Sequence, residues 1–66
     1  MTNVVHVYTL LYDEEADEYF VHTRIRSFKI VYPSANYWEL WEKVDTGYEF
    51  KRQAKSLGAL LEYLCS

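Results

Sequence analysis

The sequence lacks the disulfides and structural metal sites that stabilise many small domains. Cysteine occurs once, as Cys65, so no internal disulfide can form, and no set of Cys and His residues offers a structural zinc site. A chain of 66 residues buries only about 60% of the surface that its unfolded form exposes. We therefore expect one small domain over residues 1–66 that is held together by packing alone.

Glycine and proline are also scarce: the chain has two glycines, Gly47 and Gly58, and one proline, Pro33. Phosphate-binding loops need several glycines close together, and no such motif is present. No Ser, His and acid set and no Cys and His pair can be picked out as a nucleophile with its base. We predict that the protein is not an enzyme and uses no cofactor and no metal.

Long apolar runs are missing as well. No stretch approaches the roughly 18 apolar residues that a membrane span requires. The opening MTNVVHVYTL has neither the basic start nor the long apolar segment of a signal peptide, and Cys65 is not placed in a prenylation box. We expect a soluble, cytoplasmic protein that does not act at a membrane.

Aromatic residues, by contrast, are abundant, with seven Tyr, three Phe and two Trp. Each buried ring removes roughly 150–250 Å² from water, so a few rings can take the place of a disulfide or metal site. The chain has more rings than one small core is expected to enclose. We predict that the surplus forms a surface interaction patch or the contact of a homodimer.

Two segments rich in β-branched and aromatic residues, VVHVYTLLY and YFVHTRI, flank the acidic run DEEADE, which predicts a β-hairpin. Placing Leu11 opposite Tyr19 collects the apolar residues on one face, whereas a slip of one residue would bring Arg24 and Arg26 to that face. We predict the first register, with a loop over 13–17. Its apolar face holds Val5, Val7, Thr9, Leu11, Tyr19, Val21, Thr23 and Ile25, and its other face holds His6, Tyr8, Leu10, Phe20, His22, Arg24 and Arg26.

The apolar residues change parity within the segment HTRIRSFKIVY. An unbroken strand would bury Lys29 and expose Phe28 and Ile30, which is unfavourable. A bulge or tight turn at Arg26–Ser27 restores the pattern. We predict that irregularity, followed by a third extended segment over 28–32.

A second hairpin is predicted over YWELWEKV, DTG and YEFKRQA, because a three-residue connection that ends in glycine suits a type I turn with a glycine bulge. A helix over 37–44 is the alternative, since Tyr37, Trp41 and Val44 also have helical spacing. Closing the hairpin with Val44 opposite Tyr48 puts Trp38, Leu40, Val44, Tyr48, Phe50 and Ala54 on one face. The other face then holds Tyr37, Glu39, Trp41, Lys43, Glu49, Lys51 and Gln53, with Lys43 opposite Glu49.

The last segment predicts an amphipathic helix. Ser56 is a suitable N-cap, and the apolar stripe consists of Leu57, Leu60, Leu61 and Leu64. So short a helix is marginal alone in water, so its leucines must pack on a sheet. We therefore predict an α+β fold, in which a small antiparallel sheet of two β-hairpins (four to five strands) carries the C-terminal α-helix on one face.

Charge is concentrated at the tip of the first hairpin, where five of the ten acidic residues lie: Asp13, Glu14, Glu15, Asp17 and Glu18. This tip is either a solvated loop that keeps the chain soluble or an acidic finger that contacts a basic groove on a partner. It resembles the start of a calcium loop in spacing, but Glu18 stands where that loop needs glycine and Arg24 where it needs glutamate. We expect no specific calcium site.

Tyr37 and Trp41 share the face of the second hairpin that the helix would leave uncovered. Trp and Tyr are the residue types most often found at interface hot spots, although a second core layer or a homodimer seam would use the same pair. We predict a non-catalytic protein-binding module that acts as a small regulator or inhibitor of a larger protein or complex. Its predicted partner-binding residues are Tyr37, Trp41, Asp13, Glu14, Glu15 and Asp17.

The alternative function is a sheet that binds single-stranded nucleic acid through Tyr8, Phe20, Arg24 and Arg26, since bases stack on aromatic rings and phosphates pair with Arg. The isoelectric point near 5.2 and the acidic tip weigh against nucleic acid as the partner. His6 and His22 share one predicted face and could begin a metal site, but no third ligand follows.

Overall fold

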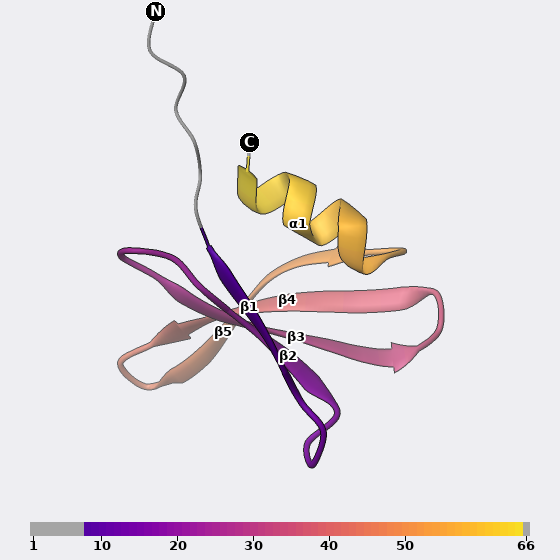
Figure 1. The fold of residues 1–66 in the computed structure, drawn as a ribbon, viewed down its shortest axis with the longest axis horizontal. Helices are drawn as coiled ribbons and strands as arrows, with labels where there is room; N and C mark the ends of the chain where they lie inside the picture. The colour runs from indigo at the N-terminus through magenta and orange to yellow at the C-terminus, as the bar shows by residue number, and fades with distance from the viewer. Residues whose placement is uncertain (1–7, 66) are drawn as a thin grey trace, which may run out of the picture.

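The computed structural model describes residues 8–65, which form one antiparallel sheet and one helix. The strands are β1 (Thr9–Asp13), β2 (Glu18–His22), β3 (Ser27–Ser34), β4 (Tyr37–Val44) and β5 (Gly47–Ala54), and the helix is α1 (Leu57–Cys65). The strands lie in the sheet in chain order, and α1 crosses one face of the sheet (Figure 1). The predicted α+β class is confirmed, and 37–44 is a strand rather than a helix.

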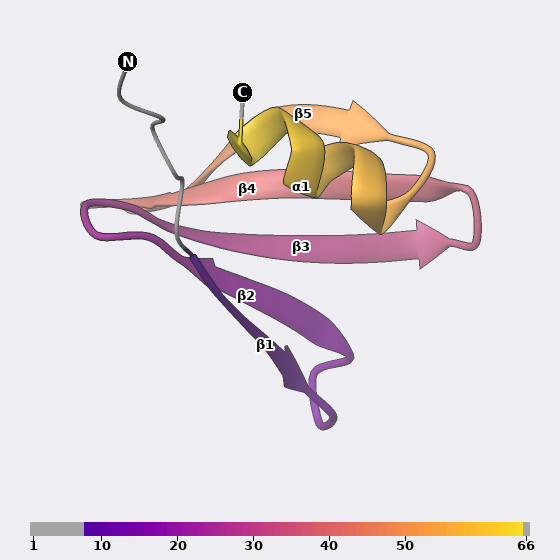
Figure 2. The same ribbon diagram turned by 45° about the horizontal axis from the view of Figure 1, so that its top comes forward.

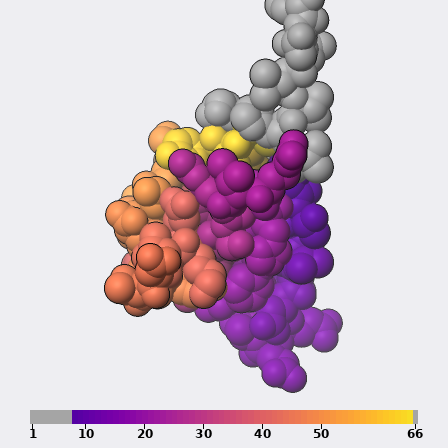
Figure 3. Space-filling view, turned by 90° about the vertical axis from the view of Figure 1, so that its left-hand side faces the viewer, coloured from indigo at the N-terminus to yellow at the C-terminus, as the bar shows by residue number. Residues whose placement is uncertain are grey.

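The core lies between the sheet and α1. Its buried side chains are Val21, Phe28, Ile30, Leu40 and Leu60. The predicted N-cap is present, because the Ser56 hydroxyl accepts a hydrogen bond from the Ala59 amide at 3.2 Å. Leu60 is fully buried and the other stripe leucines pack partly buried around it, so the predicted leucine stripe is confirmed. Figure 3, viewed from the end with the β2–β3 and β4–β5 turns, shows α1 as a single thin layer over the strands.

Aromatic rings extend the packing on the helix side of the sheet. Tyr12 and Tyr19 have ring centroids 4.8 Å apart, and Tyr32 stacks on Trp38 at 4.4 Å. Tyr19 lies 6.0 Å from Trp38 and so connects the two pairs. Figure 2 shows β1 and β2 diverging from β3 toward the tip of the first hairpin. Part of the predicted aromatic surplus therefore extends the core.

The register predicted for the first hairpin is wrong by one residue. The structure pairs Leu10 with Val21 and Leu11 with Phe20, so Leu11 lies on the face opposite the core. The prediction used Arg24 and Arg26 to choose the register, but the strand ends at His22, so these two arginines do not constrain it. The tip also differs, because 14–17 is the connection and Asp13 pairs with Glu18. Val5, His6 and Val7 lie outside the described residues.

The break predicted within HTRIRSFKIVY is present as a tight turn, but it lies over 23–26 rather than at Arg26–Ser27, and Ser27 already belongs to β3. The Thr23 amide donates to the Arg26 carbonyl at 2.8 Å, and the Thr23 hydroxyl accepts from the Arg26 amide at 3.0 Å. His22 then pairs with Ser27, so the chain reverses and β3 runs antiparallel to β2. The prediction that Thr23 and Ile25 belong to an apolar strand face is wrong, since Ile25 is 87% exposed at the turn.

The second hairpin also closes differently from the prediction. Its turn has two residues, 45–46, and Gly47 opens β5 opposite Val44 with a φ of 136°. Lys43 consequently faces Tyr48 rather than Glu49.

A bulge then corrects the register of this hairpin. Trp41 pairs with Phe50 but Leu40 pairs with Arg52, so Lys51 is the extra residue on β5. Because the turn has two residues, Tyr48 and Phe50 share the face of Trp41, and their predicted place beside Leu40 is wrong. Within residues 8–65, no helix has the length and apolar character required to cross a membrane.

Candidate functional site: the open face of the sheet

One residue from each strand forms a row across the face opposite α1. The cross-strand partners run from Leu11 to Phe20, to Lys29, to Trp41 and to Phe50. Partners in an antiparallel sheet project on the same side, and the buried core residues of β2, β3 and β4 occupy the alternate positions. We call Leu11, Phe20, Lys29, Trp41 and Phe50 the open-face row.

The side chains of the open-face row support one another without a covering layer. Leu11 is 52% exposed and Phe50 47%, while the three central members are half-buried. Trp41 and Phe50 meet edge to face with centroids 5.4 Å apart. The Lys29 ammonium lies 4.3 Å from the centroid of the Tyr48 ring, within the range of a cation–π contact. The row is thus an ordered, largely apolar surface.

Glu39 links the two aromatic residues predicted as contact sites. The Trp41 indole donates a hydrogen bond to Glu39 Oε1 at 3.1 Å. The pKa of Tyr37 is raised because its hydroxyl donates to the same carboxylate. Tyr37 and Trp41 therefore lie on the open face of β4, half-buried and oriented by one shared acceptor. Whether they bind a partner stays a prediction.

Two of the predicted acidic contact residues have structural roles at the tip. Asp17, at a φ of 55°, accepts hydrogen bonds from the hydroxyls of Tyr12 (2.6 Å) and Tyr32. These bonds lower the pKa of Asp17 and raise the pKa values of both tyrosines. Asp13 accepts from the amide of Glu15 at 3.0 Å and so shapes the turn.

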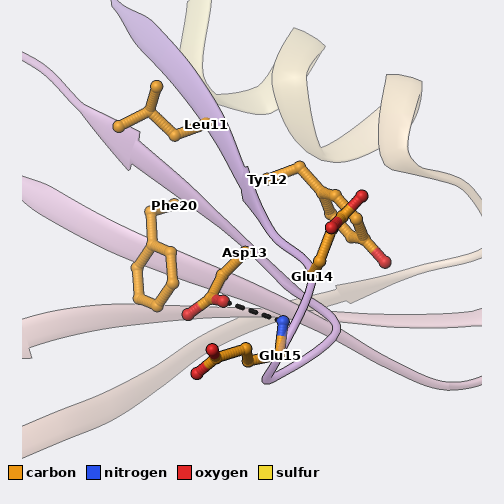
Figure 4. A pocket seen from close by; sticks show the side chains of 6 residues that line it. All are labelled: Leu11, Tyr12, Asp13, Glu14, Glu15 and Phe20. Atoms are coloured by element: carbon orange, nitrogen blue, oxygen red, sulfur yellow. Dashed lines mark hydrogen bonds between the residues drawn. The ribbon is translucent and has the colours of Figure 1, made fainter.

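Glu14 and Glu15 differ from these two aspartates. Both are exposed, and neither side chain has an ion pair within residues 8–65. Figure 4 shows Leu11, Phe20 and the carboxylates of Asp13 and Glu15 on one side of the ribbon, with Tyr12 and Glu14 on the other. A shallow hollow is lined by these six residues. Acidic side chains therefore border the Leu11 and Phe20 end of the open-face row.

The residues of the predicted nucleic-acid face do not share one face, because the turn at 23–26 ends the strand that was to hold them. Phe20 belongs to the open-face row, whereas Tyr8 packs against the core. Arg26 lies 3.6 Å from Glu42, whose cross-strand partner is the buried Phe28, so it belongs to the helix side. Arg24 is exposed in the turn itself.

The sequence interpretation missed three exposed members of the open face: Leu11, Tyr48 and Phe50, which it assigned to the core faces. A two-residue turn before Gly47 would have placed Tyr48 and Phe50 beside Trp41. For Leu11 the sequence carries no such signal, since only the tip geometry fixes its register.

The described residues offer little to a metal. His22 lies with its Nδ1 3.0 Å from the Ser27 hydroxyl, and His6 falls outside the described residues. No group of three His, Cys, Asp or Glu side chains within 8–65 is arranged to hold a metal ion.

Comparisons with protein-family models, curated proteins and solved structures find no match to this chain. The assignment of the site therefore depends on its geometry and charge.

Proposed function

We propose that the protein is a cytoplasmic, non-catalytic protein-binding module that regulates or inhibits a larger protein or complex through the open face of its sheet. The observation that supports this is the open-face row, which is ordered and partly exposed across all five strands. Protein interfaces commonly have such an apolar centre with a polar rim and are enriched in Trp, Tyr and Phe.

The charge of the open face favours a protein over nucleic acid as partner. Its strands carry three carboxylates, Asp13, Glu18 and Glu39, against two ammonium groups, Lys29 and Lys43. A phosphate chain would be repelled by this balance, whereas a basic protein surface would be attracted. Asp13 and Glu18 lie at the Leu11 and Phe20 end, so the partner is expected to place its cationic residues there.

Single-stranded nucleic acid remains the second candidate because of one feature. Phe20, Trp41 and Phe50 flank Lys29 in the row, and aromatic rings beside cations form stacking platforms for bases. A fluorescence titration with oligonucleotide at two salt concentrations separates the candidates. Salt-sensitive binding at tens of micromolar would favour this candidate over a protein partner, because phosphate contacts weaken steeply with salt.

The test of the main proposal begins with capture from the native host by the tagged full chain. The captured protein is identified and purified, and its affinity is measured for the wild type, Trp41→Ala and Phe50→Ala. Truncation of interface hot spots costs roughly 2 kcal/mol or more, which is about thirtyfold in affinity. Ile25→Ala is the matched control, because Ile25 is exposed but lies in the turn at 23–26.

Each variant is first shown to be folded by circular dichroism and thermal unfolding. Weakened binding by folded Phe50→Ala and Trp41→Ala, with Ile25→Ala unchanged, supports the proposal. Folded variants that bind the partner as tightly as the wild type would overturn it, because the open face would then not be the contact surface.

A further inference from the structure

Strand β1 is an edge of the sheet. Within residues 8–65, only β2 pairs with it, so one side of its backbone faces outward. The strand, TLLYD, carries a single charge, at Asp13, and the side chains of Leu10, Leu11 and Tyr12 are all exposed. Figure 3 shows β1 (indigo) as one margin of the molecule. An apolar edge strand with unpaired amides and carbonyls is a template for another strand.

The opposite edge of the sheet, β5, is protected against pairing with another strand. Strand β5 carries Glu49, Lys51 and Arg52 and is distorted by the bulge at Lys51. Charged residues and bulges are the means by which natural sheets block edge pairing. The two edges of this sheet are therefore unequal, and β1 is the one left open.

We propose that β1 pairs antiparallel with β1 of a second copy of the chain, about a two-fold axis through Leu11, which joins two five-stranded sheets into one. A two-fold axis perpendicular to the sheet places both helices on one face and both open-face rows on the other. This axis also requires that one residue of β1 lie opposite the same residue in β1 of the second copy.

Centring the pair on Leu11 engages all of β1. Leu11 then lies opposite the partner's Leu11, and Leu10 lies opposite the partner's Tyr12, so apolar side chains meet on both faces. Thr9 lies opposite the partner's Asp13, a polar pair without like charge. Centring on Tyr12 instead would place Asp13 opposite the partner's Leu11 and leave Thr9 unpaired.

The acidic tip selects the antiparallel orientation, and the self-complementary pairing of Leu10, Leu11 and Tyr12 favours a second copy as occupant. In the antiparallel pair the two tips, residues 13–18, point to opposite ends of the joined sheet. A parallel pair would place the tips side by side, where their carboxylates would repel one another. The strand thus fits itself in one orientation. Since only one strand from each copy takes part, we expect a weak dimer that dissociates on dilution.

The first test is sedimentation equilibrium of the purified full chain over a concentration series. The wild type is expected to shift from monomer toward dimer as concentration rises. Leu11→Lys should weaken association roughly tenfold or more, because two like charges would lie directly opposite each other. Ile25→Lys, an equally apolar-to-charged change at the exposed turn, should associate as the wild type does. Thermal unfolding shows that both variants are folded.

A wild type that stays monomeric at millimolar concentration would overturn the proposal, and so would a folded Leu11→Lys that dimerises normally. Both tests use the protein alone, so their failure is distinct from failure of the proposed function, which is tested with the captured partner and with variants of Trp41 and Phe50.

The second test is disulfide trapping in a Cys65→Ser background. Opposed Cα atoms in an antiparallel pair are about 4.5–5.5 Å apart, which lies within the roughly 4.4–6.8 Å that a disulfide spans. Under mild oxidation Leu11→Cys should therefore form a covalent dimer faster than Ile25→Cys. Equal rates would overturn the proposal. A faster dimer from Phe50→Cys would also overturn it, because the copies would then meet through their open faces.

Discussion

The hydroxyl of Tyr32 donates a hydrogen bond to the carboxylate of Asp17, which joins the tip of the first hairpin to β3. Tyr12 donates to the same oxygen from β1 at 2.6 Å. One of the tip's own acids therefore ties the tip to the sheet, and the backbone of Asp17 is left-handed there, with a φ of 55°.

Replacing Asp17 should destabilise the fold. Asp17→Ala removes both hydrogen bonds and leaves at φ 55° a residue that tolerates the left-handed region less well than Asp does, so its thermal midpoint should fall. Asp17→Asn keeps an acceptor and tolerates this backbone region, so its midpoint should fall less. Glu14→Ala, at an exposed neighbour, is the control and should leave the midpoint unchanged. A stable Asp17→Ala would contradict the role assigned to this carboxylate.

The same contacts predict how stability changes with pH. The pKa of Asp17 is lowered from its ordinary 3.8 by the tyrosine hydrogen bonds, so its contribution is present above pH 3.8 and disappears as pH falls through the lowered folded value. The pKa of Tyr32 is raised from 10.0 by its bond to Asp17. The contribution of Tyr32 is therefore complete below pH 10 and is lost as pH rises through the raised value.

Urea midpoints from pH 2 to pH 11 measure both effects. The difference between the wild type and Asp17→Asn should be largest near neutrality and should shrink as the pH falls below 3.8. In Tyr32→Phe, the part of the decrease in the urea midpoint at alkaline pH that ionisation of Tyr32 causes should be absent. Equal differences between wild type and Asp17→Asn at pH 2 and pH 7 would show that the Asp17 carboxylate is not involved.

The two glycines should respond in opposite directions to the same substitution. A Cβ at Gly47 or at Gly58 would meet no atom within 4 Å, so neither change causes a clash. Gly47 has a φ of 136°, which disfavours an L side chain, so Gly47→Ala should destabilise by roughly 1–2 kcal/mol. Gly58 is helical, so Gly58→Ala should stabilise by roughly 0.5–1 kcal/mol. Chemical unfolding of both variants checks the two signs.

Removing the central leucine of α1 should abolish the fold at ordinary temperature. Leu60 is fully buried between the helix and the sheet, and Leu to Ala at such sites costs roughly 2–5 kcal/mol. A core of this size supplies only about 3–5 kcal/mol in total. Circular dichroism at 25 °C should show Leu60→Ala largely unfolded, while Ile30→Val, a smaller change in the same core, stays folded.

The helix and the fold class could be predicted from sequence because their signals are local. Ser56 and the leucines that follow fix both the start of α1 and its buried side within nine residues. The two hairpin registers could not be predicted in the same way. Each depends on a turn whose length the sequence leaves open, and one residue more or less exchanges the two faces.

The candidate site also combines features that local sequence signals predict with features that depend on the hairpin registers. Trp41 and Tyr37 could be placed on the uncovered face from their position in β4, since their parity does not depend on the turn. Leu11 and Phe50 reach that face only through the slipped registers. Asp17 looked like one solvated acid among five, because nothing in the run DEEADE marks which carboxylate two distant tyrosines will contact.

Because α1 rests on β4 and β5, while β1 supplies no buried side chain, the sheet is anchored unevenly from one margin to the other. Backbone amides should therefore exchange with deuterium in a graded order, earliest in β1 and latest in β3 and β4 around Ile30 and Leu40. If β1 separated transiently from the sheet, β2 would become the edge strand and the packing of the helix would be unchanged. The molecule can thus loosen at one side while it remains folded at the other.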